Sequence, residues 1–243
     1  MSVSVSAFDQ YARGAWERFV KDPARARASL DALQGIKVER VLDVGCGAGH
    51  ELLPFAREGA FAVGLDLAPE VGHAGRQLFA QQDQEANVAF IRGAAERIPF
   101  PAGAFDLVIC RLVLPYTDNA RALKEFARVL RPGGALLLKI HHARYYFQEF
   151  GQALMARRVL NMIHAARVLL AGATYHLTGT QPRSNFPSSE TFQTRWLLNR
   201  EAERAGLRIQ SRLPDANYLT PSFLIIKQVE RGECKKDGLL AVF

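Results

Sequence analysis

Short apolar runs rich in β-branched residues alternate with longer helix-length stretches along the first 140 residues. The apolar runs have strand length and lie at residues 40–44, 62–65, 88–91, 107–110 and 135–140. The stretches between them include candidate helices at residues 51–58, 70–82 and 119–129. This alternation predicts a parallel sheet whose crossover helices cover its faces.

The later part of the chain predicts two more strands, at residues 207–213 and 223–229. They should form an antiparallel hairpin, because the turn-like Leu213-Pro214-Asp215-Ala216-Asn217 separates them. Upstream, Arg131-Pro132-Gly133-Gly134 predicts the end of the 119–129 helix and a turn into the fifth strand. Ser188 or Ser189 is the expected N-cap of a helix at 191–206.

Residues 141–195 begin with an aromatic cluster, Tyr145-Tyr146-Phe147 and Phe150, and continue into an expected helix at 154–173. Its helical wheel has one apolar face and an opposite face with Arg157, Asn161, His164 and Arg167; the apolar face holds Met155, Val159, Met162, Ile163, Ala166, Leu169 and Leu170. The basic residues argue against a bilayer-spanning helix. Two interpretations stay open: a lid packed on the sheet, or a contact with an anionic membrane or lipid-linked substrate.

Composition changes this picture little. A chain of 243 residues with 49% apolar residues can bury a full core. The N-terminal MSVSVSAFDQ lacks the features of a secretory signal or transit peptide, so a cytoplasmic location is expected. Cys46, Cys110 and Cys234 have no CxxC spacing, which favours free thiols and predicts no metal site.

The net charge of +7 is concentrated in the second part of the chain. Residues 1–140 carry 17 basic and 16 acidic side chains, whereas residues 141–243 carry 14 and 8. This excess raises nucleic acid as a partner. However, the basic residues are spread over many segments and form no recognisable RNA-binding module, so a nucleic-acid partner is not favoured.

A glycine-rich segment, Gly45-Cys46-Gly47-Ala48-Gly49, lies where the first predicted strand passes into a helix. Glycines at such a turn allow a ligand to approach the backbone, and the free N–H groups of the helix start favour a negative group. The Gly-x-Gly-x-Gly spacing differs from that of dinucleotide-binding and phosphate-binding loops. The alternative is an ordinary tight turn.

Together with four further segments in matching order, Leu42–Gly49 resembles the first motif of the class I S-adenosylmethionine-dependent methyltransferases, in their ubiquinone and small-molecule (type 11-like) branch. The four segments lie at residues 64–70, 93–100, 105–109 and 130–134. The resemblance implies an α/β fold with a Rossmann-like, seven-stranded, mostly parallel sheet and an antiparallel C-terminal hairpin, and the less family-like residues 141–195 are expected to add a helical lid after strand five. It divides the chain into cofactor-covering helices (1–35), a cofactor-binding core (36–140), the lid (141–195), the completion of the sheet (196–230) and a polar tail (231–243).

The resemblance also implies S-adenosylmethionine as cofactor. The implied contacts are Tyr11, Asp43, Gly45, Cys46, Gly47, Gly49, Asp66, Leu67, Ala95, Glu96 and Arg111. Asp66 would hold the ribose, and Asp43 and Arg111 the methionine end, with a helix N-cap as the alternative role for Asp66 and loop bracing for Asp43. Ala94 departs from the family, which has an acidic residue at this position beside the adenine.

Methyl transfer is an in-line displacement that mainly requires alignment, although a general base can remove a proton from the acceptor. His141, His142 and Tyr116 are the candidates for this role, the alternative being ordinary polar and packing residues at strand exits. The expected function is methylation of a small or lipid-like acceptor, with oxygen favoured and nitrogen or carbon possible. An RNA methyltransferase and a non-catalytic protein that binds a partner or a membrane surface through residues 154–173 stay as alternatives.

Overall fold

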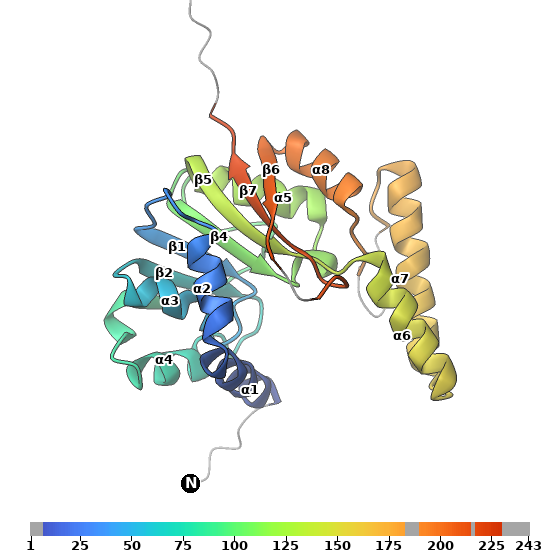
Figure 1. The fold of residues 1–243 in the computed structure, drawn as a ribbon, viewed down its shortest axis with the longest axis horizontal. Coiled ribbons are helices and arrows are strands. Elements are labelled where there is room, and N and C mark those ends of the chain that lie inside the picture. The colour runs from blue at the N-terminus through green and yellow to red at the C-terminus, as the bar shows by residue number, and fades with distance from the viewer. Residues whose placement is uncertain (1–6, 183–189, 215–216, 230–243) are drawn as a thin grey trace, which may run out of the picture.

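The computed structural model describes residues 7–182, 190–214 and 217–229. Within them, seven strands form one sheet of order β3-β2-β1-β4-β5-β7-β6 (Figure 1). The strands are β1 (Arg40–Val44), β2 (Phe61–Asp66), β3 (Val88–Arg92), β4 (Phe105–Arg111), β5 (Leu130–Lys139), β6 (Leu207–Arg212) and β7 (Ser222–Lys227). β7 runs antiparallel to β5 and β6, and the other pairs are parallel. The expected fold class is confirmed.

The central strands β1, β4 and β5 are buried on both faces of the sheet, which explains why they read as continuous apolar runs. One face packs against α5 (Asn119–Val129) and α8 (Arg195–Arg204), through side chains such as Phe126 and Leu198. The other face packs against the N-terminal helices and the helices that follow β1 and β2, through Trp16, Leu52 and Phe79. These helices are α1 (Ala7–Lys21), α2 (Pro23–Asp31), α3 (Leu53–Arg57) and α4 (His73–Ala80).

Several predicted elements differ at their ends. The first crossover begins as a 3₁₀ turn at His50–Leu52, so α3 is shorter than the helix expected at 51–58. α4 begins at His73 and not at residue 70, because Gly72 takes a left-handed conformation with φ of 78°. α5 ends at Val129 as expected, but Pro132, Gly133 and Gly134 lie inside β5, in an irregular stretch where the register against β4 shifts.

The prediction of a single helix at 154–173 is wrong. The structure has two helices, α6 (Ala143–Met155) and α7 (Val159–Thr178), which lie against each other as a hairpin beside the sheet (Figure 1). Arg157 adopts φ of 54°, and Arg158 N–H donates to the carbonyl of Ala153 at 2.8 Å, which closes α6 and turns the chain back. Helical periodicity alone misses this break because no proline or glycine marks it.

The helical hairpin also changes which side of α7 is buried. Ala165, Val168, Gly172 and Tyr175 are buried. On the face expected to be covered, Met155, Val159, Ile163 and Leu170 are 87%, 62%, 60% and 70% exposed. The interpretation that this face packs on the sheet is therefore wrong, because α7 packs its other side against α6 and against Phe192, in the segment before α8.

The helix expected at 191–206 begins later, at Arg195, with Thr194 as its N-cap. The preceding residues are extended because they pair with two loops: Thr191 N–H donates to Pro115 O and Gln193 N–H to His141 O, both at 3.0 Å. The N-cap candidates Ser188 and Ser189 lie outside the described residues, as do the polar tail and Cys234. The division of the chain into segments stays a prediction.

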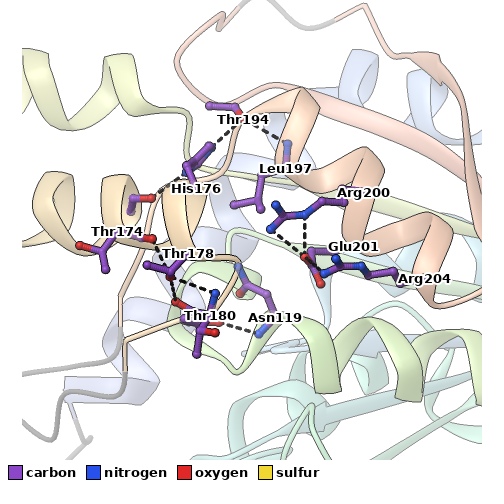
Figure 2. A network of polar contacts seen from close by, with 12 residues as sticks. Asn119, Thr174, His176, Thr178, Thr180, Thr194, Leu197, Arg200, Glu201 and Arg204 are labelled. Atoms are coloured by element: carbon purple, nitrogen blue, oxygen red, sulfur yellow. Dashed lines mark hydrogen bonds and ion pairs between the residues drawn. The ribbon is translucent and has the colours of Figure 1, made fainter.

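A polar network joins the C-terminal end of α7 to the core (Figure 2). His176 contacts Gly172 O through Nδ1 at 2.7 Å and Thr194 Oγ1 through Nε2 at 2.8 Å. Gln181, just beyond α7, accepts a hydrogen bond from Asn119 N–H, at the start of α5, at 3.0 Å. The base of the helical hairpin is thus held against the starts of α5 and α8.

No helix within the described ranges has both the length and the apolar character to cross a membrane. Nor do His, Cys, Asp and Glu side chains gather there into a group of three that could bind a metal ion. Cys46 and Cys110 are buried free thiols.

Candidate functional site

A cavity of about 630 Å³ opens at the carboxyl ends of β1, β2 and β4, where ligands bind in sheets of this topology. Eleven of the fourteen predicted site residues line it: Asp43, Gly45, Cys46, Gly47, Asp66, Leu67, Ala95, Glu96, Arg111, Tyr116 and His141. Another hollow, of about 730 Å³, is lined by residues of β6 and β7, by Gly133 and by residues 228–229, and includes none of the predicted site residues. The chemistry-bearing side chains therefore converge on the first cavity.

All three glycines after β1 have positive φ, but the space around each one differs. A Cβ on Gly45 would collide with the side chain of Val113, and one on Gly49 would lie 2.9 Å from the ring of Phe90. A Cβ on Gly47 would meet no protein atom within 4 Å. Since Gly47 lines the cavity, it leaves space for a ligand at the turn.

Asp66, at the end of β2, reaches across to this glycine turn. Its Oδ2 accepts a hydrogen bond from Gly47 N–H at 2.9 Å, and its Oδ1 accepts one from Ala68 N–H at 3.0 Å. A carboxylate can accept about four hydrogen bonds, so each oxygen keeps capacity for a ligand. Asp66 therefore braces the loop and presents a negative charge to the cavity.

An ionic cluster centred on the buried carboxylate of Glu51 lines the cavity beside β1. Glu51, with a side chain only 4% exposed, pairs with Arg25 of α2 and lies 2.9 Å from Nε of Arg111. Arg111 also donates to Ser29 Oγ at 2.8 Å. The guanidinium of Arg111 thus ties the end of β4 to α2, a role that its position in the sequence does not reveal.

Asp43 is nearly inaccessible, and its burial, reinforced by nearby Glu51, raises its pKa well above the usual range. The positive charge of Arg111 offsets this effect only in part. A cationic group bound in the cavity would favour the ionised carboxylate. The site is therefore electrostatically suited to a ligand that carries a positive charge near Asp43.

The loop after β3 forms the wall beside Asp66. Ala94, Ala95 and Glu96 line the cavity, and Glu96 Oε1 accepts a hydrogen bond from Asp118 N–H at 2.9 Å. This bond connects the loop to the start of α5. Ala94 presents a methyl group where the resembling family has an acid.

The N-terminal helix α1 covers part of the cavity, with Ala15 and Arg18 in its lining. The helix is held in place by Trp16, whose ring packs edge-on to Phe79 at 5.2 Å, and by Phe19, whose ring lies 5.4 Å from that of His50. Tyr11 lies on α1, but its side chain is outside the described part of the structure.

Among the described residues of the 141–195 segment, His141 alone lines the cavity. Its Nδ1 lies 3.1 Å from the hydroxyl of Tyr146, which donates to Glu190 Oε1 at 2.6 Å. The other oxygen of Glu190 lies 3.2 Å from His164 Nε2, on α7. A chain of polar groups, buried as far as Glu190, therefore leads from the cavity to the helical hairpin.

This chain decides which nitrogen of His141 can act as a base. The Tyr146 hydroxyl gives its only proton to Glu190, so its oxygen accepts the proton that His141 carries on Nδ1. His141 Nε2 then keeps its lone pair. Burial lowers the pKa of His141 from 6.5, which favours the unprotonated ring at pH 7.

The remaining candidates occupy different positions. Tyr116 lines the cavity, is 50% exposed and meets the His141 ring edge-on at 6.3 Å. His142 is outside the cavity lining and caps α6 by accepting from Arg144 N–H at 3.2 Å. Gly49 is also outside the lining, at the start of the 3₁₀ turn.

Sequence reasoning missed several lining residues: Arg18, Arg25, His50, Glu51 and Thr117. Only their positions in the sequence could have predicted them as lining residues, since each follows a strand end or lies on an N-terminal helix. Tyr146 and Glu190 were missed as partners of His141, because the hydrogen bond between them spans 44 positions.

Residues 42–138 match the family model of the methyltransferase domain. This part of the chain is therefore similar to a methyltransferase domain. The chain is 40% identical over 105 residues to the uncharacterised methyltransferase YcgJ of Bacillus subtilis, covering 43% of this chain and 41% of that protein. It is 32% identical over 127 residues to the ubiquinone/menaquinone biosynthesis C-methyltransferase UbiE of Vibrio vulnificus, covering 51% and 45%.

The fold of the methyltransferase domain extends over most of the chain. A crystal structure of a SAM-dependent methyltransferase from Methanosarcina mazei matches with a TM-score of 0.57 and 19% identity, covering 82% of this chain and 98% of that one. By contrast, the sequence matches span less than half the length of the curated relatives. The core is therefore shared, and the helical hairpin lies outside the matched family region.

S-adenosylmethionine is the cofactor of methyltransferase domains with this fold, and the cavity fits it. Its amino and sulfonium groups are cationic and suit the buried carboxyl of Asp43, while its ribose diol suits the Asp66 carboxylate. The open space at Gly47 accommodates a ligand against the backbone.

Proposed function

We propose that this protein transfers a methyl group from S-adenosylmethionine to a small, lipid-like acceptor that carries an ionisable hydroxyl. The observation that carries the proposal is the juxtaposition of two sites in one cavity. The glycine turn and Asp66 lie along one wall, and the neutral imidazole of His141 lies on another. A cofactor bound at the glycine turn and an acceptor bound beside His141 would thus share one cavity.

Asp66 and the Gly47 turn would hold the ribose side of the cofactor, and Asp43 would face its positive charge. Ala95 and Glu96 would lie beside the adenine, with Leu67 packing against it. When bound, S-adenosylmethionine supplies an electrophilic methyl group, so the protein's task is alignment and exclusion of water. α1 and the Arg25–Glu51–Arg111 cluster support this by closing the N-terminal side of the cavity.

His141 would act as the general base. Its Nε2 accepts a proton from the acceptor hydroxyl, while Nδ1 stays bound to Tyr146 and the resulting positive charge is compensated by Glu190 through the Tyr146 hydroxyl. Tyr116, beside His141 and half-exposed, would contact the acceptor. His142 has no role in this proposal because it caps α6.

A phenolic acceptor fits this arrangement. Loss of its proton leaves negative charge on oxygen and on the ring carbons ortho and para to it, so one base serves either O- or C-methylation. We favour oxygen, because the proton is removed there. The relative from Vibrio vulnificus is named as a C-methyltransferase of quinone biosynthesis, so carbon is the competing outcome.

The first test is calorimetric titration with S-adenosylmethionine and S-adenosylhomocysteine. We expect micromolar binding that Asp66→Ala weakens by about 1.5–3 kcal/mol, the scale of charge-assisted hydrogen bonds. Asp118→Ala is the control, because Asp118 is another loop carboxylate with a capping role, at α5, and is absent from the cavity lining. Equal effects of both variants, or no binding by the wild type, would refute the cofactor site.

The acceptor is tested by incubating the protein with prenylated phenols and hydroquinones and measuring products by mass spectrometry and NMR. A methoxy carbon signal identifies O-methylation, and a ring-methyl signal identifies C-methylation. His141→Gln should lower turnover by about 10²–10⁴-fold while leaving cofactor affinity unchanged. Unchanged turnover would remove His141 from the mechanism without affecting the cofactor assignment.

A further inference from the structure

The helix α7 has a second apolar side that nothing in the described structure covers. Val159, Ile163, Leu170 and Leu177 are 62%, 60%, 70% and 88% exposed, and Ala166 and Ala173 between them are exposed as well. At about 100° per residue, these six positions fall within one narrow sector of the helix, opposite the side that is buried against α6 and Phe192. We call them the outer stripe.

The turn between α6 and α7 continues this surface. All residues from 154 to 161 are exposed, including Leu154, Met155 and Leu160 at 56%, 87% and 81%. Arg157 and Arg158 lie between these apolar side chains. We call residues 154–161 the hairpin tip.

The outer stripe and the hairpin tip are available to a partner. Figure 1 shows α7 at the edge of the molecule, beside the sheet and away from the N-terminal helices. The polar network around His176 and Thr194 holds the other end of α7 to α8, so the hairpin is anchored at its base (Figure 2). Contiguous exposed apolar surface of this kind marks an interaction site in a folded protein.

The positive charge around this surface indicates the kind of partner that it can bind. Residues 150–182 contain Arg157, Arg158 and Arg167 and no Asp or Glu. Pairing with the same surface of a second copy would bring arginines together without carboxylates to neutralise them. An anionic lipid surface offers both the apolar layer and the negative charge that a basic amphipathic helix requires.

We propose that the outer stripe and the hairpin tip dock this protein on an anionic membrane surface. Apolar side chains of α7 enter the boundary between headgroups and acyl chains, and Arg157 and Arg158 contact lipid phosphates. None of residues 143–182 lines the cavity, so docking is independent of the proposed methyl transfer and can be tested apart from it.

The test is co-sedimentation with vesicles of phosphatidylcholine alone and of phosphatidylcholine with phosphatidylglycerol. The full chain should bind the anionic vesicles, and binding should weaken with added salt. Replacing Leu160, Ile163 and Leu170 by serine together should lower the partition coefficient at least about tenfold. Arg157→Asn with Arg158→Gln should lower it about 30-fold, the combined value of two surface arginines.

Matched controls lie elsewhere on the protein. Phe61→Ser removes a side chain that is 44% exposed at the start of β2, and Arg121→Gln removes an exposed arginine of α5. Both controls should bind vesicles like the wild type. Thermal unfolding and titration with S-adenosylhomocysteine should be the same for every variant, which separates a docking defect from misfolding.

Three results would overturn the proposal. The first is a wild-type protein that does not bind anionic vesicles. The second is equal vesicle binding by the wild type and the serine variant. The third is a dimer in light scattering that the serine variant dissociates, without vesicle binding, which would make the outer stripe an interface between copies.

Discussion

Nδ1 of His141 lies 3.1 Å from the hydroxyl oxygen of Tyr146, and both side chains are buried. Because the hydroxyl proton is committed to Glu190, this contact specifies the tautomer of His141 that has a free Nε2. The sequence names His141 as one of three candidates for a general base, and the structure shows that a hydrogen-bonded chain orients its ring. The chain extends into α6 and the segment before α8.

Tyr146→Phe should lower kcat by about tenfold, a part of the 10²–10⁴-fold that a general base supplies. The tautomer of His141 is then no longer specified, whereas the affinity for S-adenosylmethionine stays the same. Tyr145→Phe is the control, because Tyr145 stacks on His141 at 4.5 Å through its ring and keeps this contact without its hydroxyl. Equal losses in kcat for both variants would contradict the positioning role of Tyr146.

The pH dependence of kcat/KM should follow the lowered pKa of His141. Burial disfavours the protonated ring, so the base stays unprotonated to pH values below the ordinary 6.5. Activity should rise with pH through a midpoint below 6.5 and be level at pH 7. His141→Gln should remove this acid limb, and a midpoint above 6.5 would show that another group is titrating.

Gly45→Ala and Gly47→Ala should separate folding from binding. Alanine at 45 collides with Val113 and should lower the free energy of unfolding by about 2–4 kcal/mol, since overpacking adds to the strain of positive φ. Alanine at 47 meets no protein atom and should cost only the backbone strain, about 1–2 kcal/mol, but its methyl group occupies ligand space. Denaturant unfolding and cofactor titration measure the two effects, and undiminished cofactor affinity in Gly47→Ala would contradict the site.

Ala94→Asp should increase the affinity for S-adenosylmethionine. The change introduces the acid that the family has at this position, on a loop that lines the cavity. One added hydrogen bond to a carboxylate contributes about 1.5 kcal/mol, or about tenfold in Kd. Arg97→Asp changes an exposed position of the same loop and is the control. A weaker complex in Ala94→Asp would show that the loop binds its ligand in another way.

The parallel core could be predicted from local patterns because buried strands and crossover helices each leave a periodic signal in their own residues. β1 was predicted at its observed ends, and the other strands of the sheet differ from their predictions by a few residues. The positions of the glycine turn and of Asp66 at the binding edge could also be predicted, since parallel strands end at one edge of the sheet. These residues reach one cavity by topology alone.

The hairpin was not predictable in the same way. Its helices pack on each other through side chains from two segments, and the left-handed Arg157 that separates them carries no glycine or proline signal. Which face of α7 is buried depends on α6. The pattern of apolar residues on a helical wheel therefore cannot distinguish a packed face from an exposed one. The late start of α8 has a similar cause, because residues 191 and 193 pair with the distant residues Pro115 and His141.

The sequence by itself determined the sheet, the position of the glycine turn and the types of residue at the strand ends, because these depend on local periodicity and on strand direction. Only the tertiary structure decided the partners of those residues: Glu51 for Arg111, and Tyr146 for His141. Hydrogen bonds and ion pairs form between side chains that folding brings within about 3 Å, and a linear sequence does not encode that proximity in any one segment.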